Sequence, residues 1–370
     1  MRVLMVNRSD AYTVFGGDTL QMIKTAEALG RVGVSVDMVL ASELDKCKWR
    51  YDRVHLFNIQ TAEESLRVVR EVKSRGLPLV LSTIYWDPLP GWFRDACERS
   101  TPWHKLARLV GRRPAYGIYQ SWQRFRYPIA RVWQQQRELL QSADWLLPNS
   151  LAELRQLIAD FRLPSETECR ASVVVNGVDR ALYQEKPIAS AEWRQAIGSQ
   201  GFVLEVGRIS PEKNTLGLIQ ALWDVDIPLV FAGKPSPYSP EYTQACVEIG
   251  HRRGQVYFLD FVPNSELPGL YALAGVHALP SWRETPGLVS LEAAAAGCRV
   301  VSTEVGSARE YFGEKAWYCN PASKESVKVA VQNALRAPGT DELRELVLRR
   351  YTWDAAAQAT LDAYMKVSEA

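Results

Sequence analysis

One stretch indicates the architecture of the C-terminal half of this chain: Leu279-Pro-Ser-Trp-Arg-Glu284-Thr-Pro-Gly-Leu288-Val-Ser-Leu-Glu292-Ala-Ala-Ala-Ala-Gly297-Cys-Arg-Val300. It predicts a loop followed by a helix over 288–296, because that range is rich in helix-forming residues and Gly297 is well placed to end the helix. The free N–H groups and the dipole at a helix N-terminus favour a bound anion. We therefore expect an anion site where the loop enters the helix.

Two glutamates of this stretch stand eight positions apart, with a Pro-Gly turn between them. Glu284 falls in the loop and Glu292 in the first or second helical turn, so both can face one polar ligand. Carboxylates beside an anion site suit a ligand with a phosphate end and a hydroxyl-rich end, such as a nucleotide-sugar. For two glutamates alone, a helix cap and a solvated charge would be the simpler interpretation. Further motifs in the chain are needed to choose between a structural and a ligand-binding role.

Composition sets the bounds on the class of protein. The chain has 370 residues, which is enough for two domains of ordinary size. A formal net charge of +2 excludes a globally basic nucleic-acid binder. The six cysteines show no metal-like spacing, so we expect neither a zinc site nor a disulfide framework, and a reducing cytoplasm fits. No apolar run reaches membrane-spanning length, and the start of the chain turns polar too quickly for a signal peptide.

The first forty residues predict a βαβ unit of a doubly wound sheet. Residues 2–6 and 35–40 have the pattern of buried strands, and apolar residues with helical spacing follow Gly16-Gly17-Asp18. The G-x-G-x-x-G fingerprint is absent from the first turn, which argues against a nicotinamide enzyme. Gly17 either makes a tight turn or lets the backbone approach a phosphate or an acceptor sugar.

Strands separated by helices recur along the rest of the chain. Further strands are predicted at residues 53–57, 79–82, 143–148, 173–175, 202–206, 229–234, 256–262, 276–280 and 300–303. The polar residues 180–199 are the candidate linker. Arg208 and Lys213 follow strand 202–206 closely, and a planar guanidinium with a compact ammonium suits a diphosphate, although a charged turn is the alternative. We expect His55 to be a hydrogen-bonded strand residue rather than a catalyst.

Residues 99–137 are basic and aromatic throughout. They hold nine arginine and lysine residues without a single Asp or Glu, and seven interleaved aromatic residues. Three interpretations are open, in our order of preference: a surface that docks on anionic lipid headgroups or an anionic acceptor, a helical insert whose aromatics pack inward, and a site for single-stranded nucleic acid. The residues expected to contact the acceptor or the membrane are Arg112, Arg113, Trp122 and Arg124.

Several motifs resemble those of family 4 of the retaining glycosyltransferases. The E-x7-E signature of that family is matched by Ser281, Glu284, Gly287, Leu288, Leu291, Glu292, Ala293 and Gly297. Residues 207–213 are similar to its Gly-Arg…Glu-Lys donor motif, and residues 176–179 and 306–310 to two further loops. Two positions depart from the family pattern: residues 285–287 read Thr-Pro-Gly where Gly-Phe-Gly is usual, and Tyr85 stands where a histidine commonly contacts the donor sugar.

The resemblance implies an α/β protein of the GT-B type, with two doubly wound Rossmann-like domains that face a central cleft. Residues 1–185 would form the acceptor-side domain, which includes the basic aromatic insert 99–137. Residues 198–350 would form the nucleotide-sugar donor domain. Residues 351–370 would form a C-terminal helix that packs back on the N-terminal domain.

The resemblance also implies roles for individual residues. The implied catalytic residues are Glu284, Arg208, Lys213 and Tyr85. The implied donor-binding residues are Glu292, Gly287, Leu288, Gly17 and Val262. The two cations would neutralise the diphosphate leaving group in place of a metal ion. The first glutamate would bind a donor sugar hydroxyl and the second the ribose diol.

The sequence therefore predicts a retaining, metal-independent glycosyltransferase of the hexosyltransferase type, active in glycan, polysaccharide or glycolipid biosynthesis. Expected partners are a nucleoside diphosphate sugar as donor, a saccharide or lipid-linked saccharide as acceptor, and an anionic membrane surface; no cofactor, metal or nucleic acid is expected. The expected location is the cytoplasm, at the inner face of the cell membrane. Two alternatives stay open: a nucleotide-sugar epimerase, and a non-catalytic GT-B pseudoenzyme that docks on membrane or polysaccharide.

Overall fold

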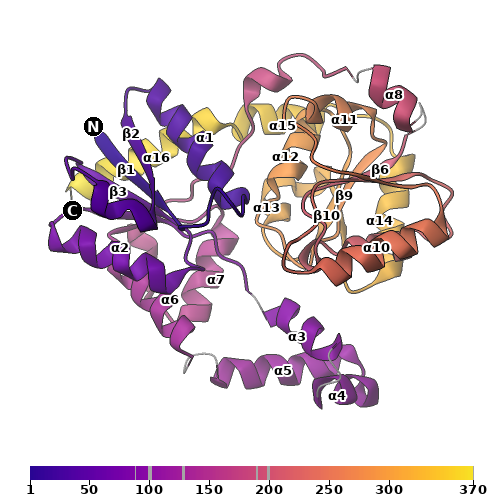
Figure 1. Ribbon diagram of the computed structural model, residues 1–370, viewed down its shortest axis with the longest axis horizontal. Helices are drawn as coiled ribbons and strands as arrows, with labels where there is room; N and C mark the ends of the chain where they lie inside the picture. Colours follow the sequence, from indigo (N-terminus) through magenta and orange to yellow (C-terminus); the bar gives the residue numbers. More distant parts are fainter. Residues whose placement is uncertain (88, 99–101, 127–129, 189–190, 198–200, 370) are drawn as a thin grey trace. The chain divides into compact units, whose positions relative to one another are not determined.

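The computed structural model describes residues 1–369 except 88, 99–101, 127–129, 189–190 and 198–200. The chain divides into two compact units (Figure 1): residues 1–175 with the C-terminal segment from Asp354, and residues 176–353. Each unit is built on its own sheet, with the order β2-β1-β3-β4-β5 in the first and β11-β10-β9-β6-β7-β8 in the second. Neighbouring strands are parallel in both. Two Rossmann-like, doubly wound sheets are thus confirmed.

The first unit alternates strands and helices as predicted up to its fourth strand, and four helices of the described residues then precede the fifth strand. Its strands are β1 (Arg2–Asn7), β2 (Ser35–Leu40), β3 (Arg53–Phe57), β4 (Leu79–Ser82) and β5 (Trp145–Leu147). Its helices are α1 (Gly17–Arg31), α2 (Ala62–Ser74), α3 (Leu89–Glu98), α4 (Pro102–Val110), α5 (Arg112–Arg126), α6 (Arg131–Ser142), α7 (Leu151–Phe161) and α16 (Trp353–Glu369). The Ser150 side chain accepts a hydrogen bond from the Glu153 N–H at 2.9 Å, which caps the start of α7.

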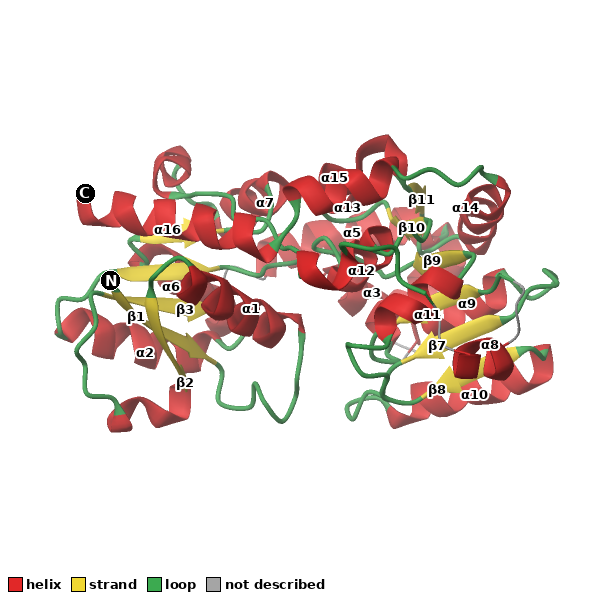
Figure 2. Cartoon of the chain, turned by 90° about the horizontal axis from the view of Figure 1, so that it is seen from above, coloured by secondary structure: helices red, strands yellow, loops and turns green. Residues whose placement is uncertain are grey.

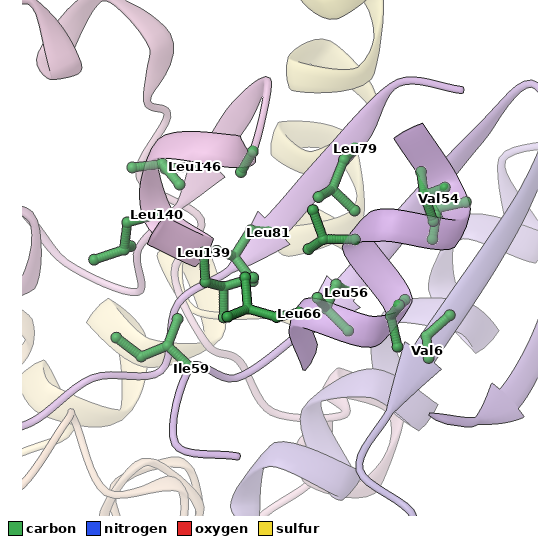
Figure 3. Packing of buried hydrophobic residues seen from close by; sticks show 14 of the residues in the cluster. Val6, Val54, Leu56, Ile59, Leu66, Leu79, Leu81, Leu139, Leu140 and Leu146 are labelled. Atoms are coloured by element: carbon green, nitrogen blue, oxygen red, sulfur yellow. The ribbon is translucent and has the colours of Figure 1, made fainter. Parts of the chain in front are cut away.

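One face of this sheet carries the main hydrophobic core of the first unit (Figure 3). Because side chains alternate between the two faces of a strand, every second residue of β1, β3 and β4 points into this core. Helices α2 and α6 cover it. The labelled members are Val6, Val54, Leu56, Ile59, Leu66, Leu79, Leu81, Leu139, Leu140 and Leu146.

The C-terminal helix α16 belongs to the first unit (Figure 2). The Nδ1 atom of His55 on β3 lies 2.7 Å from the Tyr364 hydroxyl of α16, and its Nε2 atom lies 2.9 Å from the Ser82 hydroxyl. Burial lowers the pKa of His55 to about 3, so the ring is neutral at ordinary pH. His55 is a hydrogen-bonded strand residue, and the crossing of the last helix to the N-terminal unit is confirmed.

The second unit repeats the same architecture. Its strands are β6 (Val203–Val206), β7 (Leu229–Ala232), β8 (Val256–Leu259), β9 (Val276–Leu279), β10 (Val300–Thr303) and β11 (Trp317–Cys319). Its helices are α8 (Ala191–Ile197), α9 (Thr215–Ala221), α10 (Pro240–Arg253), α11 (Leu267–Leu273), α12 (Leu288–Ala295), α13 (Ala308–Phe312), α14 (Lys324–Arg336) and α15 (Glu342–Arg350). Its core joins the sheet to α9 and α14.

The run Val173–Val175 was predicted as a strand, and that prediction is wrong. Ser172 N–H donates to the Leu146 carbonyl and Val174 N–H to the Pro148 carbonyl, both at 2.9 Å, so the run only follows the end of β5. Strand β5 itself ends at Leu147, and the chain passes into the second unit at residue 176. The β-branched residues 173–175 therefore do not continue a strand ladder, despite their strand-like composition. The described residues of the expected linker 180–199 also lie in the second unit.

Among the described residues, no helix combines the length and the apolar character needed to cross a bilayer.

Candidate active site

Two loops of the second unit lie at the carboxyl ends of β6 and β9, which are adjacent strands of its sheet. The loop after β6 carries Arg208 and Lys213, and the loop after β9 carries Glu284. Lys213 Nζ donates a hydrogen bond to Glu284 Oε1 at 2.5 Å, across 71 positions of sequence. Ligands bind at this edge of doubly wound sheets, so the structure brings two of the predicted site residues together where a ligand is expected.

Backbone contacts hold these two loops against each other. The Trp282 N–H donates to the Glu212 carbonyl at 3.0 Å. The buried Asn214 side chain donates through Nδ2 to the carbonyls of Pro280, at 3.2 Å, and Pro321, at 3.0 Å. Asn214 adopts a left-handed conformation with φ 62° at the start of α9. Lys213 is therefore positioned by its neighbours and not only by its ion pair.

A second set of backbone contacts fixes Glu284 against the loop after β10. The Glu284 N–H donates to the Val305 carbonyl at 3.1 Å, and the Glu284 carbonyl accepts from the Ser307 N–H at 2.9 Å. Gly306 lies between these partners with φ +115°, and a Cβ there would approach the Glu284 carbonyl oxygen to 2.0 Å. Only glycine fits at this position.

The Glu284 carboxylate lies beside the start of α12. A Cβ on Gly287, which has φ +77°, would be 3.1 Å from Glu284 Oε2 and 3.3 Å from Ser290 Oγ. The first N–H groups of a helix have no acceptor within it, so Gly287 and Leu288 begin a segment suited to an anion. At the other end the helix stops at Gly297, with φ +83°, as predicted.

Burial shifts the protonation of two carboxylates in this unit. Glu292, on α12, accepts a hydrogen bond from the Tyr271 hydroxyl at 3.3 Å; desolvation outweighs this bond and raises its pKa to about 7. Glu205, on β6, accepts a hydrogen bond from Thr215 Oγ1 at 2.6 Å. Desolvation raises the pKa of Glu205 to about 8, against the effects of that bond and of the Lys213 charge, with a smaller upward contribution from Glu284. The sequence interpretation missed Glu205, whose only signal is a carboxylate within an apolar strand.

The structure places Tyr85 in the core of the first unit, not at an exposed edge of the sheet. Its side chain is 2% exposed, and its ring centroid lies 5.2 Å from that of Phe161. Its hydroxyl donates to Asp160 Oδ2 at 2.8 Å. These contacts are those of a packing residue, because both the ring and the hydroxyl are directed at α7, and we leave Tyr85 out of the proposed site.

Gly17 begins α1 beside a polar cluster that the sequence interpretation missed. Arg8, directly after β1, donates through Nε to Asp18 Oδ2 at 2.8 Å and through Nη2 to the Val14 carbonyl at 2.6 Å. Asn58, directly after β3, donates through Nδ2 to the same Asp18 oxygen at 3.1 Å. The glycine loop is thus braced at the carboxyl edge of the first sheet.

The remaining predicted residues have different surroundings. Val262 lies three residues past β8 and is buried. Arg112 and Trp122 are exposed on α5, whereas the side chains of Arg113 and Arg124 lie outside the described part of the structure. Within that part, no group of three or more His, Cys, Asp and Glu side chains is arranged to hold a metal ion.

The fold and this edge-of-sheet site define a class of protein with two Rossmann-like units, and known proteins match parts of the chain. The sequence profile of the family described as glycosyl transferases group 1 matches residues 190–347. O-antigen chain mannosyltransferase B of Escherichia coli is 26% identical over 242 residues, which cover 61% of this chain and 62% of that protein. D-inositol 3-phosphate glycosyltransferase of Corynebacterium efficiens is 34% identical over 185 residues, which cover 46% of this chain and 43% of that protein. The chain thus matches about half of the length of these relatives.

Solved structures share the complete fold. Sucrose-phosphate synthase from Thermosynechococcus elongatus matches with a TM-score of 0.76 at 15% identity and covers 100% of both chains. HepE from Anabaena, solved in complex with UDP and glucose, matches with a TM-score of 0.71 at 18% identity over 99% of this chain and 100% of that one. The chain thus has the GT-B fold of these structures, and its residues 190–347 match the group 1 glycosyltransferase family.

Proposed function

We propose that this chain transfers a hexosyl group from a nucleoside diphosphate sugar to an acceptor hydroxyl, with retention of anomeric configuration and without a metal ion. The observation that carries the proposal is the Lys213–Glu284 pair at the start of α12, within the segment that matches the family. The complex of HepE with UDP-glucose, in a chain of the same fold, supports this class of donor.

The proposed chemistry depends on the negative charge that develops on the leaving diphosphate. Breaking the bond between sugar and diphosphate leaves negative charge on the diphosphate, which Lys213 and Arg208 neutralise together with the N–H groups at the start of α12. Their fixed positive charge takes the place of a metal ion. Glu284 keeps Lys213 in position and accepts a hydrogen bond from a donor sugar hydroxyl, while Glu292 accepts from the ribose diol.

A saccharide or a lipid-linked saccharide is the acceptor in this proposal, within glycan, polysaccharide or glycolipid biosynthesis. The O-antigen chain mannosyltransferase among the relatives supports a saccharide acceptor. The cysteines are free thiols, which supports a location in the reducing cytoplasm.

A transfer assay tests the proposal. The protein is incubated with nucleoside diphosphate sugars and a panel of saccharide acceptors in the presence of a chelator, and the anomeric configuration of the product is read by NMR. We expect retention, and a loss of roughly 100-fold or more in kcat for Glu284→Gln. Glu248→Gln, an exposed change on α10, is the matched control and keeps full activity.

The alternatives give different results in the same assay. Isomerised sugar released without any acceptor indicates an epimerase. Donor binding with neither transfer nor hydrolysis indicates a pseudoenzyme. An inverted product, or full activity in Glu284→Gln, contradicts the proposed mechanism.

A further inference from the structure

Helices α3, α4 and α5 of the first unit pack on one another around a small core of their own (Figure 1). Its buried members are Leu89, Phe93, Cys97, Ala115 and Tyr119. Trp103 and Tyr116 pack against this core from α4 and α5. Packing therefore accounts for the aromatic side chains that point inward, as the interpretation of this segment as a packed insert expected.

A second group of apolar side chains on the same helices stays exposed. On α5, Ile118, Trp122 and Phe125 follow one another at helical spacing on one face, and they are 51%, 37% and 77% exposed. At the end of α4, Leu109 is 83% exposed and Val110 41%. Isolated exposed apolar residues are ordinary on a protein surface, but here five occur within residues 109–125.

Basic side chains lie among these residues. Lys105, Arg108, Arg112 and Arg126 are all exposed on α4 and α5. Residues 99–137 hold nine of the 44 lysine and arginine residues of the chain and none of its 42 acidic residues, so the remainder of the chain is net acidic. The positive charge is therefore localised. We call these four residues and the five exposed apolar ones the basic-apolar surface.

A recess adjoins this surface. It has a volume of about 300 Å³ and is lined by Trp92, Gln123, Arg126, Ala130 and Val132. The Arg126 guanidinium carbon lies 4.4 Å from the centroid of the Trp122 ring. The recess thus combines a cation with apolar walls, which suits a phosphate group attached to a hydrocarbon.

We infer that the basic-apolar surface docks the chain on a bilayer that contains anionic phospholipids. Exposed apolar side chains enter the boundary between headgroups and acyl chains, while lysine and arginine bind the anionic headgroups. Single-stranded nucleic acid fits less well, because bases stack on open aromatic faces. Trp122 is flanked by Arg126 and by Trp103, at 5.3 Å between ring centroids, and three of the five exposed apolar residues are aliphatic.

Vesicle sedimentation tests this inference independently of catalysis. The full chain is mixed with vesicles of phosphatidylcholine alone or of phosphatidylcholine with phosphatidylglycerol, at low and high salt. We expect at least roughly tenfold tighter binding to the anionic vesicles, weakened by salt. Lys105→Glu/Arg108→Glu removes this preference, and Leu109→Ser/Phe125→Ser lowers binding by roughly tenfold or more.

Matched changes on the second unit serve as controls. Arg252→Glu/Lys324→Glu and Ile188→Ser/Tyr238→Ser alter equally exposed residues and leave vesicle binding unchanged. Thermal melting by circular dichroism verifies that every variant is folded. Equal loss of binding in the controls, equal binding to both kinds of vesicle, or no vesicle binding overturns the inference. Displacement from anionic vesicles by an equal charge concentration of oligothymidine assigns the surface to nucleic acid instead.

Discussion

At the scale of single residues, the proposed site holds charged side chains in fixed positions. Lys213 is partly exposed and paired with a nearly buried carboxylate, so it can meet a phosphate without leaving Glu284. Glu292 has a different property: its surroundings hold its pKa near 7, within the range where a small change in pH alters its charge. If Glu292 binds the ribose as proposed, this carboxylate gives nucleotide binding a pH dependence.

We predict that affinity for a nucleotide sugar rises with pH through about 7. A ribose diol donates two hydrogen bonds, which only the ionised carboxylate accepts in full, so binding favours the deprotonated form of Glu292. Below the pKa each pH unit then costs up to about tenfold in affinity, and above it the affinity levels off. Calorimetric titration from about pH 6 to about pH 8 measures this, with Glu292→Gln as the control that removes the dependence. The same slope in both proteins would place the titrating group elsewhere.

At the scale of elements, the conformation of the loops that carry Lys213 and Glu284 depends on glycines and on one asparagine. The limits of α12 could be predicted from its helix-forming residues and Gly297. The contacts of Asn214 with two other loops could not, because they join residues 66 and 107 positions apart. Gly306 looks like any turn glycine in the sequence, yet the Glu284 carbonyl leaves no room for a Cβ there.

We predict that Gly306→Ala costs roughly 3 kcal/mol or more in the free energy of unfolding and lowers transfer activity. It adds a backbone clash to an unfavourable φ and displaces Glu284. Gly254→Ala is the matched control in the same unit: its φ of +78° and ψ of 162° also disfavour alanine, but a Cβ there meets nothing within 4 Å, so we expect a cost of about 1–3 kcal/mol and unchanged activity. Denaturant unfolding and initial rates test this. Similar losses in both variants would mean that Gly306 does not position Glu284.

At the scale of the whole molecule, the alternation of strands and helices predicted two doubly wound sheets, and the family resemblance predicted the return of the last helix. The change of unit near residue 175 could not be predicted, because Val173–Val175 has the composition of a strand. Nor could the burial of Tyr85: its place after a strand suggested a ligand contact, whereas α7 supplies partners for both its ring and its hydroxyl.

We predict that Tyr364→Ala destabilises the first unit and spares the second. The buried ring of Tyr364 fills space against β3, and its loss also leaves His55 Nδ1 without this partner, so the cost is about 3–5 kcal/mol. Tyr364→Phe, which keeps the ring, costs about 1–3 kcal/mol. Hydrogen exchange read by mass spectrometry separates the units: protection falls in β1 and β3 and stays unchanged in β6 and β9. An equal fall in both sheets would show that the units do not unfold separately.

In the proposed function, residues 207–213, Glu284 and the start of α12 form a metal-independent nucleoside diphosphate site. Calorimetric titration with the diphosphates of uridine, guanosine, adenosine and thymidine, in the presence of a chelator, measures whether that site exists. We expect one of them to bind, and Lys213→Ala to weaken its binding by roughly 10- to 100-fold whereas Lys324→Ala on α14 does not. If none of the four binds the folded protein, or if Lys213→Ala binds as tightly as the unchanged chain, the proposed site is wrong.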